Sequence, residues 1–280
     1  MAKNNTKLSK ISALHYFKLI FRSLLLLATL TLYVTNRILK PELPYTSFIS
    51  FESLYNNTLE KFGYGILIFM AVVWCIFIIE MLLRFFPCSL ESMGCQKQFK
   101  RNFIKTKQEN PNKSSWLPTF AIAMAWFALN GFIGILYFLG VIDVGILLII
   151  SLAYSVCDMI CILFFCPFQT WFMKNKCCGS CRIYNWDFAM MFTPLIFVPH
   201  YYTWSLLGAA LLLLAVWEIY LRVHPERFAE ECNSALSCAN CKEKLCHHKK
   251  QLRGFLKKRK DRLSLKGNSV IKKSNEKNED

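Results

Sequence analysis

The sequence contains apolar blocks that are too long for the core of a water-soluble domain. A membrane span needs about 20 mostly apolar residues, because about 30 Å of hydrocarbon is crossed at 1.5 Å per helical residue. Hydrophobic residues make up 54% of the 280 positions, and they gather in six such blocks. The expected fold class is therefore all-α, a multi-pass membrane protein with six transmembrane helices. The predicted spans are Leu19–Val34, Gly63–Phe86, Leu117–Gly140, Ile142–Phe165, Phe188–Tyr202 and Trp204–Leu221.

Two of these spans carry special features. The first follows four lysines between residues 3 and 18, like the charged start of a secretory signal. No cleavage site of small residues follows it, which predicts a retained signal-anchor. The fifth span is short and contains Pro194 and Pro199. It either crosses the membrane with a kink or enters and leaves on one side, and the hydropathy pattern leaves both alternatives open.

The distribution of basic residues predicts the orientation. Cytosolic segments of membrane proteins carry an excess of Lys and Arg. If six spans cross and the N-terminus is cytosolic, 31 of the 34 basic residues lie on the cytosolic side. Both termini are then cytosolic, and the six spans form three hairpins. The predicted regions are a basic N-terminus (1–18), three hairpins (19–86, 117–165 and 188–221), cytosolic loops (87–116 and 166–187), a Cys-rich segment (222–248) and a basic tail (249–280).

Cysteines gather on the predicted cytosolic side, where ten of the thirteen lie. Cytosolic thiols are kept reduced, so a cluster there favours metal binding over disulfides. Two runs have the Cys-x-x-Cys spacing that lets both sulfurs reach one ion. The sequence between them folds as the third hairpin, which returns both runs to one membrane face. The favoured ligands are Cys178, Cys181, Cys238 and Cys241.

Other cysteines leave the ligand set open. A local site within 232–246 is one alternative, and a second site nearer the loops is another. Zinc and an iron–sulfur cluster both prefer thiolates, and the sequence does not decide between these cofactors. A structural and an electron-transfer role therefore both stay open. The further candidate ligands are Cys166, Cys177, Cys232 and Cys246.

Carboxylates within the spans suggest a second function. A charged side chain near the bilayer centre costs about 2.5 kcal/mol or more, so each carboxylate should have a partner. Glu80 with Arg84, and Glu218 with Arg222, have the i,i+4 spacing of local ion pairs. Asp158 has no such neighbour on its own helix, and Arg22 and Asn130 are its candidate partners. Asp158 with Cys157 and Cys161 could alternatively form an intramembrane station of a soft-cation transporter.

The C-terminal tail is basic, with apolar residues interleaved from Lys249 to Lys273. As a helix it would lie on the anionic cytosolic leaflet, and lipid is a simpler partner than nucleic acid next to six spans. The core of this lipid-binding stretch is Lys257, Lys258, Arg259 and Lys260. No catalytic triad, Gly-rich phosphate loop or His-x-x-x-His helix is visible, so no enzymatic activity is assigned. The expected location is the cell membrane.

Overall fold

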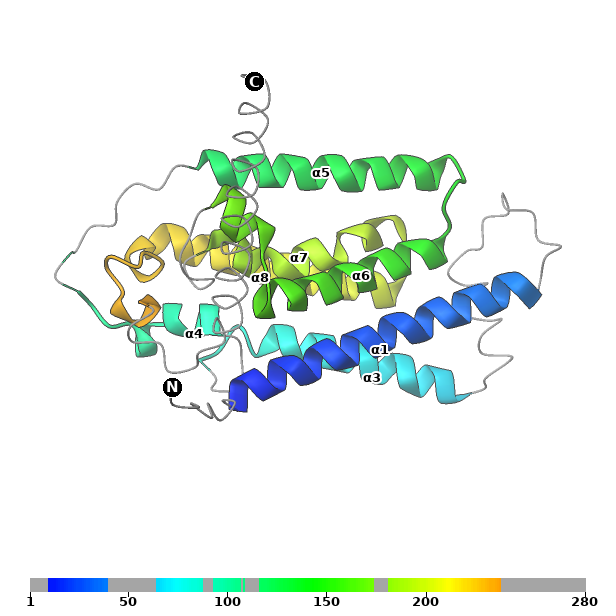
Figure 1. Cartoon of the computed structure of the whole chain (residues 1–280), viewed down its shortest axis with the longest axis horizontal. Helices are drawn as coiled ribbons and strands as arrows, with labels where there is room; N and C mark the ends of the chain where they lie inside the picture. Colours follow the sequence, from blue (N-terminus) through cyan, green and yellow to red (C-terminus); the bar gives the residue numbers. More distant parts are fainter. Residues whose placement is uncertain are drawn as a thin grey trace, which may run out of the picture.

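The computed structural model describes residues 10–39, 64–87, 93–106, 108, 116–173 and 181–237. Within these ranges the regular elements are helices, and the extended chain pairs in one isolated bridge between Lys105 and Asn233. This confirms the predicted all-α class. Figure 1 shows the long helices running side by side along the longest axis of the molecule. They are α1 (Lys10–Leu39), α3 (Tyr64–Leu82), α5 (Leu117–Phe138), α6 (Val144–Leu163) and α8 (Tyr201–Val223).

Shorter helical elements connect the long helices. Two are short α-helices, one is a π-helical turn, and the others are 3-10 turns. They are α4 (Met93–Gln98), η1 (Lys100–Asn102), η2 (Phe168–Phe172), η4 (Arg182–Trp186), α7 (Asp187–Phe192), η5 (Thr193–Phe197), η6 (Pro225–Arg227) and η7 (Ser234–Leu236).

Local chemistry fixes where several long helices begin. The Asp143 carboxylate accepts a hydrogen bond from the Ile146 N–H at 2.9 Å and so caps α6. The His200 ring accepts one from the Tyr202 N–H at 3.1 Å at the start of α8. Between α5 and α6, Gly140 has a φ of 73°, a left-handed conformation that glycine adopts without a steric penalty. The chain therefore turns sharply between α5 and α6.

Four helical segments are long and apolar enough to cross a membrane: Ala13–Thr35, Leu117–Phe138, Val144–Leu163 and Tyr201–Val223. The predicted third, fourth and sixth spans match three of them closely. The first helix begins at Lys10 rather than Leu19. The second predicted span corresponds to α3, whose apolar stretch Ile68–Leu82 is shorter than the others. Large apolar side chains on these helices face outward, as is expected where lipid replaces water.

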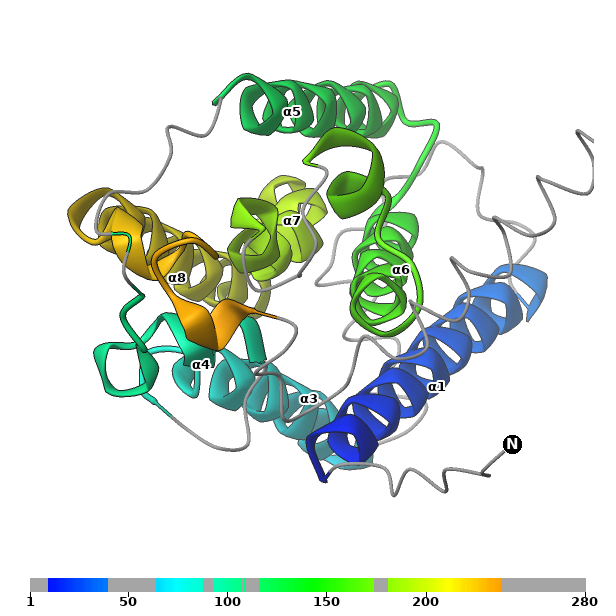
Figure 2. The same ribbon diagram turned by 60° about the vertical axis from the view of Figure 1, so that its left-hand side comes forward.

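The fifth predicted span is a broken helix. Its first part is α7, and its second part is the 3-10 turn η5, which begins one residue before Pro194. Figure 2 shows α7 inside a ring formed by α1, α3, α5, α6 and α8. Most of the segment is buried, and side chains from the surrounding helices bind it. The Ser151 hydroxyl donates to the Met191 carbonyl at 2.9 Å, and the Trp126 indole N–H donates to the Thr193 hydroxyl at 3.2 Å.

One end of the bundle is closed by a small folded cap, which consists of residues 93–106, η4 and residues 224–237. Within it, α4 packs against both η4 and η7. The Ser234 N–H donates to the Ile104 carbonyl at 2.9 Å, and the Thr106 N–H donates to the Cys232 carbonyl at 3.1 Å. Segments that follow three different long helices thus meet at the same end of the molecule. The six-span arrangement and the side on which each terminus lies stay predictions.

Candidate functional site

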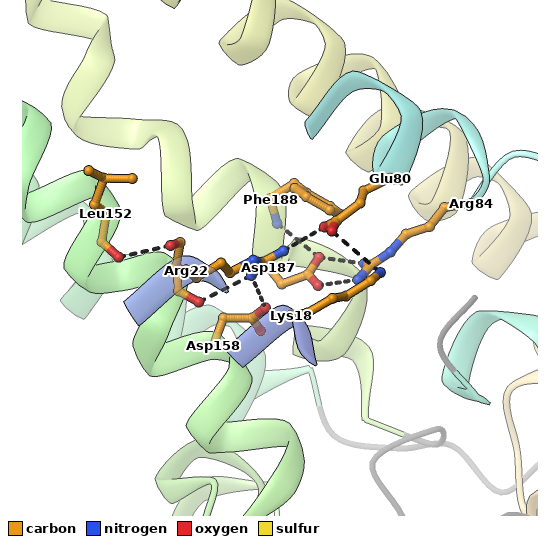
Figure 3. A network of polar contacts seen from close by, with 9 residues as sticks. Lys18, Arg22, Glu80, Arg84, Leu152, Asp158, Asp187 and Phe188 are labelled. Atoms are coloured by element: carbon orange, nitrogen blue, oxygen red, sulfur yellow. Dashed lines mark hydrogen bonds and ion pairs between the residues drawn. The ribbon is translucent and has the colours of Figure 1, made fainter. Parts of the chain in front are cut away.

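Six ionisable side chains form a buried charge cluster between α1, α3, α6 and α7 (Figure 3). Three are cations and three are carboxylates, so the cluster is neutral when all six are ionised. Burying an unpaired ion costs several kcal/mol, and this cost explains why the two signs occur together. The members of the charge cluster are Lys18, Arg22, Glu80, Arg84, Asp158 and Asp187.

Arg22 is the centre of the charge cluster. Its side chain is only 2% exposed, and it reaches from α1 to both α3 and α6. One guanidinium nitrogen lies 2.7 Å from Glu80 Oε2. The other donates to the Ser155 carbonyl at 3.1 Å and lies 3.3 Å from Asp158 Oδ2. The guanidinium also lies over the Phe77 ring, 5.5 Å from its centroid. A single side chain therefore joins three helices inside the bundle.

Arg84 and Asp187 form the second half of the cluster. One guanidinium nitrogen donates to Asp187 Oδ1 at 2.6 Å, and the second lies 2.6 Å from Oδ2 in an ion-pair contact without hydrogen-bond geometry. The Phe188 ring covers the guanidinium at 4.5 Å, and the Phe188 N–H donates to Asp187 Oδ1 at 2.8 Å. This pair fastens the end of α3 to the start of α7. It therefore fixes the position at which the broken helix begins.

The predicted local ion pairs are wrong in their partners. Glu80 binds Arg22 and, at 3.6 Å, Lys18 on α1, whereas Arg84 binds Asp187. Pairs at i,i+4 lie on the surface of one helix, where lipid surrounds them. Pairing between helices instead buries the charges in the bundle interior, which is where ionisable residues of membrane proteins are found.

The same correction applies to α8. Glu218 accepts hydrogen bonds from the Arg182 guanidinium and, at 2.8 Å, from the Trp186 indole N–H. Arg222, its predicted partner, is exposed. The observed contacts fasten η4 to the end of α8, and so they hold the start of the broken helix beside its neighbour.

The structure pairs Asp158 with Arg22, one of the two partners that the sequence predicts, and not with Asn130. Asn130 instead donates to the Trp126 carbonyl on its own helix at 3.0 Å. Cys157 is exposed and Cys161 is half-buried. In the part of the chain that the structure describes, no three potential ligands lie together as a metal site. The soft-cation station is thus not assembled by these residues, and that transport function stays a prediction.

Two of the predicted cytosolic ligands lie in the described residues before η4, Cys181 buried and Cys166 half-buried. Cys181 is 4% exposed and packs in one cluster with Ile122 and Ile183. Cys166, after α6, accepts a hydrogen bond on its sulfur from the Gln169 N–H at 3.4 Å. Both positions are compatible with a small buried side chain, and Cys181 also directly precedes η4 in the cap.

Cys232 lies in the cap and is 1% exposed. Burial raises the pKa of this thiol, and the nearby carboxylates of Glu231 and Glu226 raise it further. The role of Cys232 as a metal ligand stays a prediction. The remaining predicted ligands and the lipid-binding residues lie outside the described residues: Cys177, Cys178, Cys238, Cys241, Cys246, Lys257, Lys258, Arg259 and Lys260.

Asn233 is a structural residue of the cap that the sequence analysis did not single out. It is fully buried. Its amide nitrogen donates to the carbonyls of Lys97 and Arg227, each at 2.9 Å, and its amide oxygen accepts from the Ala235 N–H at 3.1 Å. An asparagine beside a Cys-rich run carries no sequence signal for this role, because its partners are backbone groups that only the fold brings near.

Comparison with known proteins gives no match to a family model, to a curated protein or to a solved structure.

Proposed function

We propose that this chain is a multi-pass membrane protein whose cytosolic end holds a cysteine-thiolate metal centre. The proposed ligands are Cys178, Cys181, Cys238 and Cys241. One observation carries the proposal: α4, a helix of six residues and about 9 Å, packs against both η4 and η7. Cys181 directly precedes η4, and Cys238 follows η7 by two residues. The two Cys-x-x-Cys runs are therefore attached to neighbouring points of the cap.

The chemistry of these residues agrees with a closed metal site. Four thiolates satisfy the tetrahedral geometry of structural zinc, and they also suit an iron–sulfur cluster. Burial of Cys181 is compatible with ligands shielded from water. Such a centre would join the segments after α6 and α8, and its role is structural if the metal is zinc. An iron–sulfur centre would add electron transfer.

The proposal includes six crossings with both termini in the cytosol, in a cell membrane. The bias of basic residues supports it, since 31 of 34 then lie on one side. The fifth crossing is based on this charge bias alone, because α7 and η5 together have a summed rise of about 19 Å, less than the thickness of the hydrocarbon layer.

Elemental analysis tests the metal centre. We expect the full chain, purified without oxygen, to carry zinc or iron, and Cys238→Ser with Cys241→Ser to lose it. The control is Cys75→Ser, because Cys75 is exposed on α3 and belongs to none of the candidate ligand sets. Visible absorption separates the two metals, since zinc centres are colourless and iron–sulfur clusters are not. A wild-type protein without bound metal, or a double variant that keeps it, contradicts the proposal.

We also propose that the basic tail binds the anionic cytosolic leaflet. Each Lys or Arg near an anionic surface contributes about 1 kcal/mol. A peptide of residues 249–273 should float with vesicles that contain phosphatidylserine, and replacing Lys257, Lys258, Arg259 and Lys260 with Ala should remove most of this binding. Equal binding to neutral vesicles contradicts the electrostatic mechanism.

A further inference from the structure

We infer that the charge cluster is a proton-binding site inside the membrane, with Asp158 as the group that takes up the proton. This inference goes beyond the thiolate centre and does not depend on it. It is based on how unequally the three buried carboxylates are held.

Asp187 and Glu80 are held firmly. Asp187 has both oxygens within 2.6 Å of Arg84 nitrogens and accepts a further bond from the Phe188 N–H. Glu80 lies 2.7 Å from Arg22 and 3.6 Å from Lys18. Each of these carboxylates therefore faces at least one cation at close range, and removing its charge would lose a short ion pair.

Asp158 is held weakly. Among the described residues, its contact is with one Arg22 nitrogen at 3.3 Å, and that nitrogen also donates to the Ser155 carbonyl at 3.1 Å. An ionised carboxylate can accept about four hydrogen bonds, and the described residues supply Asp158 with few of them. A buried carboxylate that receives few hydrogen bonds loses least when it becomes neutral.

The surroundings of Asp158 contain charges of both signs, contributed by α1, α3 with its end, and α7. Arg22 favours the ionised form, but it is shared with Glu80 at the shorter distance. The nearby carboxylates favour the neutral form. The charged groups that act on Asp158 are Arg22 from α1, Arg84 at the end of α3 and Asp187 from α7. Lys18 and Glu80 are the other members of the cluster, and His15 is a further buried titratable group on α1.

Proton uptake has a simple balance. Asp158 accepts one proton from water, its carboxylate becomes a carboxylic acid, and no covalent bond to another group forms. Arg22 then keeps Glu80 as its counter-ion and retains the Ser155 carbonyl. The proton reaches the site from the edge of the cluster that is formed by Lys18 and Asp158. The side chains of these two residues are 13% and 15% exposed. The same edge lies towards the end of the bundle that carries the cap.

Infrared difference spectroscopy of the reconstituted full chain tests this inference. Acidification from about pH 9 to about pH 6, a range in which exposed carboxylates stay ionised, should produce the C=O stretching band of a protonated carboxylic acid, and this band should be lost in Asp158→Asn. The matched control is Asp143→Asn, because Asp143 lies at the other end of α6 and asparagine also caps helices. This control should keep the band.

Isotope labelling keeps the test decisive if Asp158→Asn fails to fold. Carbon-13 in aspartate carboxyl groups should shift the band in the wild-type protein, and Asp158→Glu should retain a band that no longer shifts with this label. The inference is overturned if the folded wild-type protein shows no band, if Asp158→Asn keeps it, or if the aspartate label leaves it unchanged.

Discussion

At the scale of single residues, the buried ions determine which substitutions the bundle tolerates. Arg84 and Asp187 are both almost completely buried, and each is the principal counter-ion of the other. Removing one partner of such a pair leaves an uncompensated charge, which costs far more than the pair itself contributes.

We therefore expect Arg84→Ala to destabilise the protein by about 3–5 kcal/mol, the usual cost of breaking a buried ion pair. Resistance of the purified protein to unfolding in SDS measures this loss. Arg222→Ala is the control, because Arg222 is exposed at the end of α8. Similar losses in both variants would show that the buried pair has no special role.

A second prediction at this scale concerns Cys232. Burial raises the pKa of its thiol, with further contributions from Glu231 and Glu226. In the folded protein this thiol should stay protonated to higher pH than an ordinary cysteine. It therefore contributes stability below the unfolded pKa, and this contribution is lost as pH rises through the folded value.

Alkylation of the Cys232 peptide, followed by mass spectrometry, measures this effect. The rate should begin to rise at higher pH in the folded chain than in the chain unfolded with SDS. Coincident pH profiles in the two states would contradict the assigned surroundings of the thiol.

At the scale of helices and turns, contact between α5 and the broken helix depends on a glycine. A Cβ atom at Gly134 would lie 2.4 Å from the Phe197 ring, whereas a Cβ at Gly131 would meet nothing within 4 Å. The two glycines lie on the same helix, three residues apart, so they form a natural pair for comparison.

Gly134→Ala should destabilise the protein by about 1–3 kcal/mol, the typical cost of overpacking, because the ring or α5 must move. Gly131→Ala should be neutral or stabilising by up to about 1 kcal/mol, because alanine favours helix. Thermal denaturation of the two variants in the same detergent compares them. A larger loss for Gly131→Ala would contradict the packing of α5 on η5.

The long helices were predictable because each one needs a long apolar run, and such runs are visible without any tertiary contact. The break between α7 and η5 was not predictable in the same way. This segment contains Pro194, and packing inside the ring of helices holds it in place, not helix propensity. The ion pairs were harder to predict. Arg22 lies 136 positions before Asp158 in the chain, and the i,i+4 spacing of Glu80 and Arg84 favoured a local pair that does not form.

At the scale of the whole molecule, the cap predicts which parts of the chain share one side of the membrane. Residues 96–106, 182–186 and 229–237 are in contact through Gln98, Asn185 and Asn233. A membrane-impermeant label directed to single introduced cysteines at Lys100 and Glu231 should therefore react from the same side. Glycosylation sites inserted between residues 41 and 60 should be used on the opposite side. Labelling of Lys100→Cys and Glu231→Cys from different sides would contradict the fold.

The equal number of buried cations and carboxylates has a consequence for synthesis in the cell. The ribosome produces Lys18 and Arg22 first, and their counter-ions at 80 and 158 arrive much later. The leading helix therefore cannot be fully neutralised until more than half of the polypeptide has been translated. We expect nascent chains that stop before residue 80 to be extracted from membranes by alkali more readily than chains that continue past residue 190, and Arg22→Leu to remove this difference.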